Sequence, residues 1–523
     1  MTAWSSLPQL LRERARASGD RPALRFEGVI LTVAALDAAA SRWAEALAGL
    51  GVVRGERVAI CLPNGLDAPA AWLGVASLGA VVVPVNYGYR DEDLRFVLSD
   101  SGATTVVTTP ERAPDLLRAA ARCLGLRTVA VLGMMAPPGA EPLADRLANA
   151  SPARDLEPPA ANDLVTLQYT SGTTGFPKGC MLTHGYWLHL GAGALEYGRF
   201  TPDDVILSAA PVWYLDAMWH VTLALMAGAP LVMLPRFSAS GFWRTVRDNG
   251  VTFFYCLGTM PVLLLKQPAD PELDRGHRVR FVLCSGIVPQ LHRTFEERWG
   301  CPWREAYGTT EIGAGLMVPL DDTDSVGSGF MGRVVEHREA RVVDPATDRP
   351  VPRGTPGELQ FRGPGMMLGY WGHQEASDRY LRGGWAHTGD LAVENEQGYY
   401  RLVGRLKDMI RRGGENVSAM EVESVLAEHP EVHAAACVPV PDEVRGEEIK
   451  AYVQLAPGID AVASDPGALL GWLAQRLAAF KVPRYLEFVE TFPLTPSERI
   501  AKHLLKPGRT WDRTIPGWME SHA

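Results

Sequence analysis

The chain has 523 residues, more than one hydrophobic core holds, so two or more domains are expected. Hydrophobic residues make up 47% and charged residues 21%, as in ordinary soluble enzymes, and a net charge of -9 with mixed signs argues against a nucleic-acid partner. The seven cysteines are scattered singly, which argues against a zinc site or disulfide framework and favours a reducing cytoplasm. The most apolar stretch, residues 71–85, is too short to span a bilayer, so no membrane partner is expected.

The first part of the chain predicts alternating helices and strands. The spacing of apolar residues predicts an amphipathic helix over residues 36–50 and buried strands over 57–61, 81–84 and 104–108. Residues 137–162 are rich in Pro, Ala and acidic side chains and are predicted to form a surface connection. This alternation predicts a mostly parallel sheet covered by helices.

A second region of the same kind follows, with strands predicted over 205–208, 230–234, 253–257 and 280–284. From residue 341 to 363 the pattern changes to short strands with turns, which predicts a small antiparallel β-barrel.

The pattern changes again after Gly404 and Arg405. A small α+β domain is predicted there. Its elements are helices over 420–428 and 466–479 and strands over 432–440 and 447–454. The predicted fold class is therefore α/β, with doubly wound sheets and a small β-barrel in a large N-terminal domain, followed by a small α+β C-terminal domain.

A segment rich in glycine and hydroxyl side chains follows an apolar strand predicted over residues 164–168. Glycines let a phosphate approach the backbone N–H groups, hydroxyls bind phosphate oxygens, and a lysine supplies positive charge. The segment lacks the Gly-Lys-Ser or Gly-Lys-Thr of a Walker loop, and a flexible linker is the alternative interpretation. The residues predicted to bind phosphate are Thr170, Ser171, Gly172, Thr173, Thr174 and Lys178.

This segment resembles the phosphate-binding signature of the adenylate-forming (ANL) superfamily, which comprises acyl-CoA synthetases, luciferases and the adenylation domains of peptide synthetases. The resemblance extends from Arg21 to Lys506. It implies an acyl-CoA ligase whose ligands are ATP, AMP or an acyl-adenylate, CoA and Mg²⁺.

A second motif resembles another signature of the superfamily. By that likeness Thr310 contacts the α-phosphate, and Glu311 holds Mg²⁺ together with Thr174. Mg²⁺ does take one or two carboxylates together with phosphate oxygens. A solvated turn carboxylate is the alternative for Glu311 taken alone. The motif consists of Tyr307, Gly308, Thr309, Thr310 and Glu311.

Two further motifs resemble the nucleoside site of the family. Gly286, Ile287 and Val288 fall at the adenine-stacking segment, although small residues are more usual at the last two positions and a buried strand end is the alternative. Asp390 matches the residue that accepts hydrogen bonds from both ribose hydroxyls, and Arg405 would add a second ribose contact.

In this family the C-terminal domain rotates between adenylation and attack by the CoA thiol. The hinge lies two residues after the position of Arg405, so the resemblance implies domains 1–406 and 407–523, the second mobile about a hinge at Lys407. Gly413 and Gly414 resemble the loop that lines the pantetheine tunnel, where glycine lets a thin arm pass close to the backbone. A simple β-turn is the alternative.

The sequence departs from the family at its last signature, whose lysine bridges carboxylate and phosphate during adenylation. Arg499 occupies that position, and a planar guanidinium cannot converge its donors on one spot as an ammonium does. We therefore hypothesise that adenylation is weak or lost, that transfer of the acyl group to CoA is retained, and that a separate adenylating enzyme supplies acyl-AMP. The alternatives are a complete two-step ligase that uses Arg499 or Lys502, and a catalytically silent acyl-adenylate-binding protein.

A ligase altered in this way resembles the acyl-CoA ligases of bacterial diterpenoid antibiotic pathways, such as those of platensimycin and platencin. Residues 411–418 also resemble the crotonobetaine- and carnitine-CoA ligases and the diazo-forming ligases.

The acyl pocket of the family falls on two segments. Tyr214 lies at the aromatic gate, where peptide-synthetase domains keep an Asp for the substrate amine, which argues against an α-amino acid. Trp213 beside it indicates a bulky apolar acyl group, with core packing as the alternative for the aromatic residues that follow. Gly258, Thr259 and Met260 are predicted to form the opposite wall. Free CoA is the expected acceptor, and the family is compatible with a homodimer.

Overall fold

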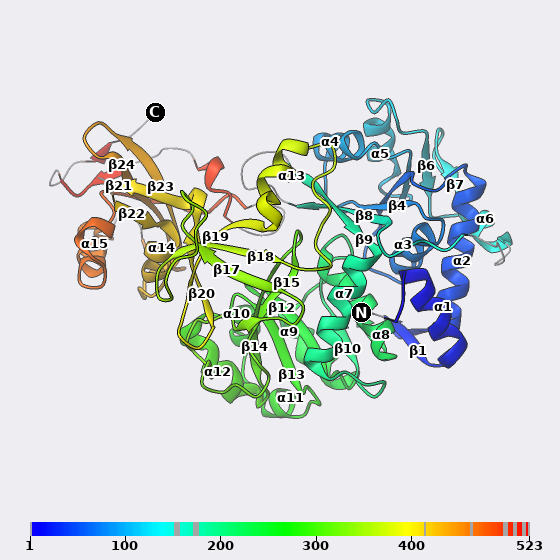
Figure 1. Cartoon of the computed structure of the whole chain (residues 1–523), viewed down its shortest axis with the longest axis horizontal. Helices are drawn as coiled ribbons and strands as arrows, with labels where there is room; N and C mark the ends of the chain where they lie inside the picture. The colour runs from blue at the N-terminus through cyan, green and yellow to red at the C-terminus, as the bar shows by residue number, and fades with distance from the viewer. Residues whose placement is uncertain are drawn as a thin grey trace. The chain divides into compact units, whose positions relative to one another are not determined.

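The computed structural model describes residues 3–150, 157–170, 177–412, 415–460, 464–494, 500–505, 510–514 and 519–520. The chain divides into two compact units, one of residues 1–340 with 361–386 and one of residues 341–360 with 387–523. The predicted fold class is confirmed (Figure 1). The boundary predicted at Lys407 concerns a hinge between moving parts and stays a prediction.

A seven-stranded sheet lies in the first unit, with the order β7-β6-β5-β3-β4-β8-β9. Its strands are parallel except for the antiparallel pair β8 and β9. Successive side chains of a strand point to opposite faces, so Val58 and Ile60 pack with helices α2 and α3, and Ala59 and Cys61 pack with α4 and α5. The elements are β3 (Arg57–Cys61), β4 (Val81–Pro84), β5 (Thr105–Thr108), β6 (Thr128–Val131), β7 (Glu141–Pro142), β8 (Leu164–Thr170), β9 (Lys178–Thr183), α2 (Val33–Gly49), α3 (Asp67–Ser77), α4 (Asp91–Ser101) and α5 (Ala113–Ala120).

A nine-stranded sheet completes the first unit, with the order β16-β15-β14-β13-β12-β10-β11-β1-β2. Phe253 faces α7 and α8 in the core shared with the seven-stranded sheet, whereas Phe254 faces α9 and α12 in a second core. The strands are β1 (Pro22–Phe26), β2 (Val29–Thr32), β10 (Ile206–Ser208), β11 (Leu231–Met233), β12 (Phe253–Leu257), β13 (Phe281–Ser285), β14 (Trp303–Thr309), β15 (Gly313–Met317) and β16 (Arg333–Val334). The helices are α1 (Leu7–Ser18), α6 (Ala144–Asn149), α7 (His184–Gly198), α8 (Leu215–Ala227), α9 (Ala239–Asp248), α10 (Met260–Leu265), α11 (Pro271–Arg275), α12 (Pro289–Trp299) and α13 (Gln374–Tyr380).

Local sequence explains where the principal helices begin and end. Thr32 and Thr183 cap α2 and α7, because each side chain accepts a hydrogen bond from a backbone N–H in the first turn. Helix α8 ends at Gly228, whose φ of 67° is the left-handed conformation that glycine adopts without strain. None of the helices in the described part of the chain is long and apolar enough to cross a membrane.

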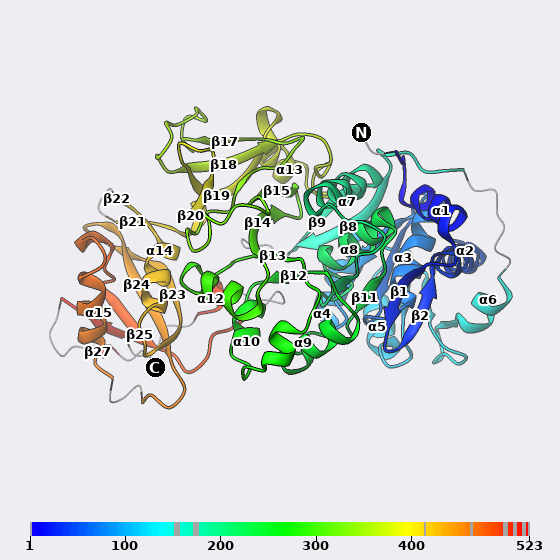
Figure 2. The ribbon, with the colours of Figure 1, turned by 90° about the horizontal axis from the view of Figure 1, so that it is seen from below.

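The C-terminal unit is built around a seven-stranded sheet, and a four-stranded sheet, β17-β18-β19-β20, lies where the small barrel was predicted. Figure 2 shows α14 beside strand β23. The helix predicted over 466–479 ends at Ala474. The elements are β17 (Glu339–Val343), β18 (Gly357–Arg362), β19 (Ala386–Glu394), β20 (Tyr400–Arg405), β21 (Met409–Arg412), β22 (Glu415–Ser418), β23 (Val432–Asp442), β24 (Gly446–Leu455), β25 (Tyr485–Phe488), β26 (Thr510–Asp512), β27 (Met519–Glu520), α14 (Ala419–Ala427) and α15 (Pro466–Ala474).

Candidate active site

The predicted phosphate-binding segment connects the antiparallel strands β8 and β9. Thr170 pairs with Lys178 in the ladder, so the two ends of the segment are held side by side. The hydroxyl of Tyr169 donates to Oδ2 of Asp100 at 2.6 Å, and a Cβ at Gly179 would lie 3.2 Å from the Tyr169 ring. The ends of the segment are therefore fixed by packing. Ser171, Gly172, Thr173 and Thr174 lie outside the described residues.

A tyrosine links this segment to the second predicted motif. Tyr370 donates its hydroxyl proton to Oε1 of Glu311 at 2.9 Å, and Nζ of Lys178 lies 5.7 Å from the centroid of the Tyr370 ring. Burial, followed by the charge of Glu311, raises the pKa of Tyr370, so the phenol stays protonated. Among the described residues no basic side chain forms an ion pair with Glu311. Its carboxylate therefore remains available to a cation, and a hard oxygen ligand of this kind suits Mg²⁺.

The second motif lies on β14 and the turn that joins it to β15. The ring of Tyr307 stacks on Phe361, with centroids 5.9 Å apart. A Cβ at Gly308 would lie 2.4 Å from the carbonyl oxygen of Gly313, so only glycine fits there. The end of β14 and the turn after it contain Thr309, Thr310 and Glu311. Side chains that follow the carboxyl end of a sheet strand are well placed for a ligand.

The segment predicted to contact adenine follows β13 and is held by a carboxylate. The backbone N–H groups of Gly286 and Ile287 donate to the two oxygens of Glu305 at 2.6 and 2.8 Å. Burial raises the pKa of Glu305 to about 7, although these two N–H groups lower it. The side chain of Ile287 packs in the core with α12, whereas Gly286 and Val288 are exposed. Glu305 was not predicted from the sequence, because its partners come from another strand.

In the second unit the structure brings the two predicted ribose contacts together. Asp390 and Arg405 face each other on β19 and β20, and Nε of Arg405 lies 2.7 Å from Oδ1 of the buried Asp390. Lys407 follows in a short 3₁₀ turn (Leu406–Asp408), where burial lowers its pKa. A Cβ at Gly404 would lie 2.5 Å from Oγ of Ser418, which brings this strand end close to the start of α14.

Three predicted residues of the C-terminal part lie outside the described residues: Gly413, Gly414 and Arg499. The residues on either side of the glycine pair, Arg412 and Glu415, are partners in the ladder of β21 and β22. Nζ of Lys502 forms an ion pair with Oε1 of Glu423 on α14 at 2.7 Å. The nearest lysine to Arg499 along the chain thus already has a carboxylate partner.

The first predicted wall of the acyl pocket is fixed by amide side chains. Asn64 accepts the backbone N–H of Val212 at 2.8 Å, and Nε2 of Gln168 donates to the carbonyl of Trp213 at 2.8 Å. Tyr214 is the residue before the first turn of α8. These contacts hold Trp213 and Tyr214 at the start of that helix.

The opposite predicted wall begins at Gly258, whose φ is 59° and whose N–H donates to the carbonyl of Ser285 at 3.3 Å. Thr259 is exposed, and Met260 begins α10 and packs on the core beneath. Strands β10 and β12 are neighbouring and parallel, so the two predicted walls follow their carboxyl ends at one edge of the sheet.

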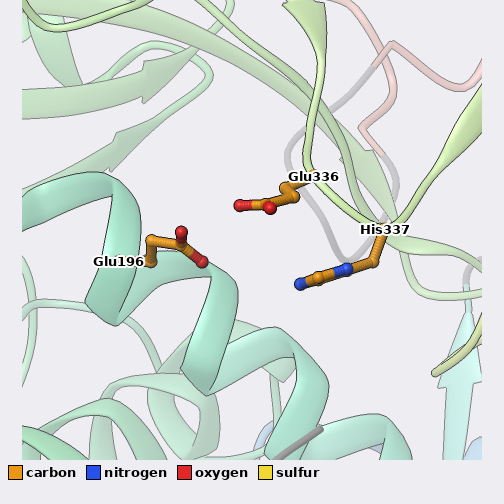
Figure 3. A group of neighbouring side chains, drawn as sticks. All are labelled: Glu196, Glu336 and His337. Carbon is orange, nitrogen blue, oxygen red and sulfur yellow. The ribbon is translucent and has the colours of Figure 1, made fainter.

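A separate group of side chains on the first unit has metal-binding chemistry (Figure 3). Glu196 comes from α7 and Glu336 and His337 from the segment after β16, and their ligand atoms all lie within 4.8 Å of one another. The hydrogen bond and the charge of Glu336 raise the pKa of Glu196. All three side chains are exposed, so water competes for them, and we assign no ion. They line a cavity of about 340 Å³. None of the residues predicted to bind the nucleotide or the acyl group belongs to the lining of this cavity.

Comparisons with known proteins identify the family of this chain. The model of the AMP-binding enzyme family matches residues 11–371, and that of the AMP-binding enzyme C-terminal domain matches residues 421–499. The chain is 35% identical to a feruloyl-CoA synthase of Amycolatopsis over 94% of its own length and 96% of that protein. It is 32% identical to a sulfoacetate–CoA ligase of Cupriavidus necator over 95% and 97% of the two chains.

Solved structures give the same result. ATP-bound MatB from Rhodopseudomonas palustris superposes with a TM-score of 0.86 at 29% identity, covering 96% of this chain and 98% of that one. The acyl-adenylate complex of o-succinylbenzoate CoA synthetase from Bacillus subtilis has a TM-score of 0.84 at 27% identity, covering 97% and 99%.

Proposed function

This chain belongs to the AMP-binding enzymes of the adenylate-forming superfamily and is an AMP-forming acyl-CoA ligase. From that premise we propose that it transfers a bulky apolar acyl group from acyl-AMP to CoA, and that its own adenylation step is weak. The observation that carries the proposal is the arginine at position 499, where the family has a lysine. A guanidinium spreads its charge and donors over a plane, so it bridges a carboxylate and a phosphate less well than an ammonium.

The state of the neighbouring lysine supports this proposal. Lys502 would have to leave Glu423 in order to act in place of the missing lysine. Glu423 also accepts the backbone N–H of Cys437 at 2.5 Å, so it is held in place to receive the ammonium. A separate enzyme that forms the acyl-adenylate is therefore the partner we propose.

The proposed nucleotide contacts follow from the resemblance to the family. Lys178 and the hydroxyl-rich segment bind the phosphate, Glu311 and Thr174 hold Mg²⁺, and Asp390 binds the ribose. Mg²⁺ supplies neutralisation of phosphate charge when it is bound. The carboxylate of Glu311, held by the Tyr370 hydroxyl, fits that ion.

The proposed acyl group is neutral and bulky, because aromatic side chains, Trp213 and Tyr214, begin the pocket wall. The similar proteins are named for a feruloyl group, for sulfoacetate and for crotonobetaine or carnitine, so charge at the acyl end varies among them. An aryl acid and a diterpenoid acid of secondary metabolism are the two candidates we propose.

A second candidate is a complete two-step ligase, which the similarity to ATP-bound MatB favours. CoA thioester formation from free acid with ATP and Mg²⁺, compared with formation from the synthetic acyl-adenylate, separates the two candidates. We expect the adenylate to be used at least roughly a hundredfold faster, and Arg499→Lys to raise the rate from acid and ATP roughly tenfold.

Lys502→Gln is the matched control, because it removes a charge from the same segment. Under the proposal it leaves pyrophosphate release as low as before. Equal rates from acid and from adenylate, lowered by Arg499→Lys, would establish the complete ligase instead. Binding of the adenylate without any thioester would show a silent binding protein.

A further inference from the structure

His220 lies on α8, inside the first unit. Its side chain is 1% exposed, and neither Nδ1 nor Nε2 has a hydrogen-bond partner among the described residues. Burial lowers the pKa of His220 to about 3, so the imidazole is neutral at pH 7. A neutral imidazole has one N–H donor and one acceptor nitrogen, and leaving such groups unpaired in the interior destabilises the fold.

Helix α8, which carries this histidine, begins directly after Trp213 and Tyr214 of the predicted acyl wall. Asp216 and His220 are four residues apart and therefore share one face of α8, whereas Trp213 precedes the helix. The ring of His220 lies 4.7 Å from that of Trp219 and 6.3 Å from that of Tyr255, centroid to centroid. Tyr255 is on β12, three residues before Gly258 of the opposite wall.

The polar side chains nearby are not available to His220. The hydroxyl of Tyr255 donates to Oγ of Ser285 at 2.8 Å, and that hydroxyl in turn donates to the carbonyl of Ala306 at 2.6 Å. Asp216 is one turn before His220, and no hydrogen bond or ion pair joins their side chains in the described structure. The imidazole is thus an unsatisfied polar group in an aromatic wall.

We infer that His220 is a specificity-determining residue that binds a hydroxyl group on the acyl substrate, at the end remote from the carboxyl carbon. The inference rests on the proposed function. A hydroxyl both donates and accepts, so it matches either tautomer of the ring. A second carboxylate on the acyl group would meet a neutral ring and the carboxylate of Asp216, which disfavours it. The substrate class is therefore a neutral hydroxylated aryl or terpenoid acid.

The test compares matched adenylates that differ by one hydroxyl. CoA thioester formation is measured with 4-hydroxycinnamoyl-AMP and cinnamoyl-AMP, and with the adenylates of a tricyclic diterpene acid with and without a remote hydroxyl. A site that hydrogen-bonds a substrate hydroxyl rejects the analogue that lacks it, so in at least one pair we expect kcat/KM to favour the hydroxylated member by roughly tenfold or more, mainly through KM.

Three variants locate the effect. His220→Phe should bring the preference close to one, and His220→Asn, which keeps a donor and an acceptor, should retain part of it. Trp243→Phe is the control, because Nε1 of Trp243 is also buried without a partner but belongs to the core under α9; it should leave the preference as in the wild type. Melting temperatures confirm that each variant is folded.

Two results overturn the inference. One is a wild type that does not discriminate in either pair, and the other is a His220→Phe variant that loses the same factor for both members of a pair. If no adenylate gives a thioester, the proposed function fails and the inference fails with it, whereas equal use of both members overturns the inference alone.

Discussion

The two compact units hold their functional charges in different ways. In the first unit, Glu311 and Lys178 both contact the neutral phenol of Tyr370. Within the described structure neither side chain forms an ion pair, so their charges are not neutralised by the protein. In the second unit Asp390 is paired with Arg405, and Lys502 is paired with Glu423. If the proposed roles hold, the first unit offers charges that no protein ion pair cancels within the described structure, whereas the second would exchange protein partners for ligand groups.

The largest effect on ligand affinity is expected at Glu311, whose charge no protein ion pair neutralises within the described structure. Glu311→Gln should weaken binding of AMP or ATP in the presence of Mg²⁺ about 100-fold, or about 2.7 kcal/mol, because an amide oxygen is a poor ligand for this ion. The amide oxygen still accepts from Tyr370, so the unfolding free energy should change by less than about 0.5 kcal/mol. Calorimetric titration with and without EDTA, together with urea denaturation, measures both effects.

Glu336→Gln is the control for this variant, since it removes an exposed carboxylate from the same unit. It should leave nucleotide affinity as in the wild type. If EDTA does not reduce the difference between wild type and Glu311→Gln, Glu311 does not act through a metal ion.

In the second unit we expect substitutions to lower the free energy of unfolding, because the charged side chains there are paired with one another. Asp390→Asn leaves the guanidinium of Arg405 without its partner, which should cost about 2 kcal/mol of unfolding free energy, less than for a fully buried pair because Arg405 is partly exposed. Glu423→Gln opens the more exposed pair with Lys502 and should cost about 1 kcal/mol or less. Urea denaturation compares them, and equal costs would show that the two pairs do not differ.

The sequence predicted the scaffold well where local signals agree. Strands β3, β4 and β12 have the predicted bounds, because each is an apolar run bounded by turn or glycine signals. The helix predicted to reach residue 479 stops at Ala474, and Ala479–Lys481 form a separate 3₁₀ turn in which Lys481 pairs with Glu421 at 2.6 Å. That ion pair depends on a helix far earlier in the chain, which local periodicity does not reveal.

The same reason explains which site residues were missed. The motif around Glu311 was recognised from its own sequence, but Tyr370, which positions it, lies 59 residues away. Glu305 was missed because it accepts two N–H groups of the segment that follows a neighbouring strand. Contacts between elements distant in the chain decide these roles.

A pH-dependent effect is expected for Glu305, which is intermediate between the two kinds of charge because backbone N–H groups hold it. Burial raises its pKa to about 7 in the folded chain, so folding favours the protonated form. That contribution to stability is complete below the usual carboxyl pKa and is lost as pH rises through 7. Between pH 5 and 8 the unfolding free energy of the wild type should fall by about 1–2 kcal/mol relative to Glu305→Gln, measured by urea denaturation. If the unfolding free energies of the wild type and Glu305→Gln depend on pH in the same way, the N–H donors stabilise the folded carboxylate as well as water stabilises the unfolded one. The segment at Gly286 would then be held equally at pH 5 and at pH 8.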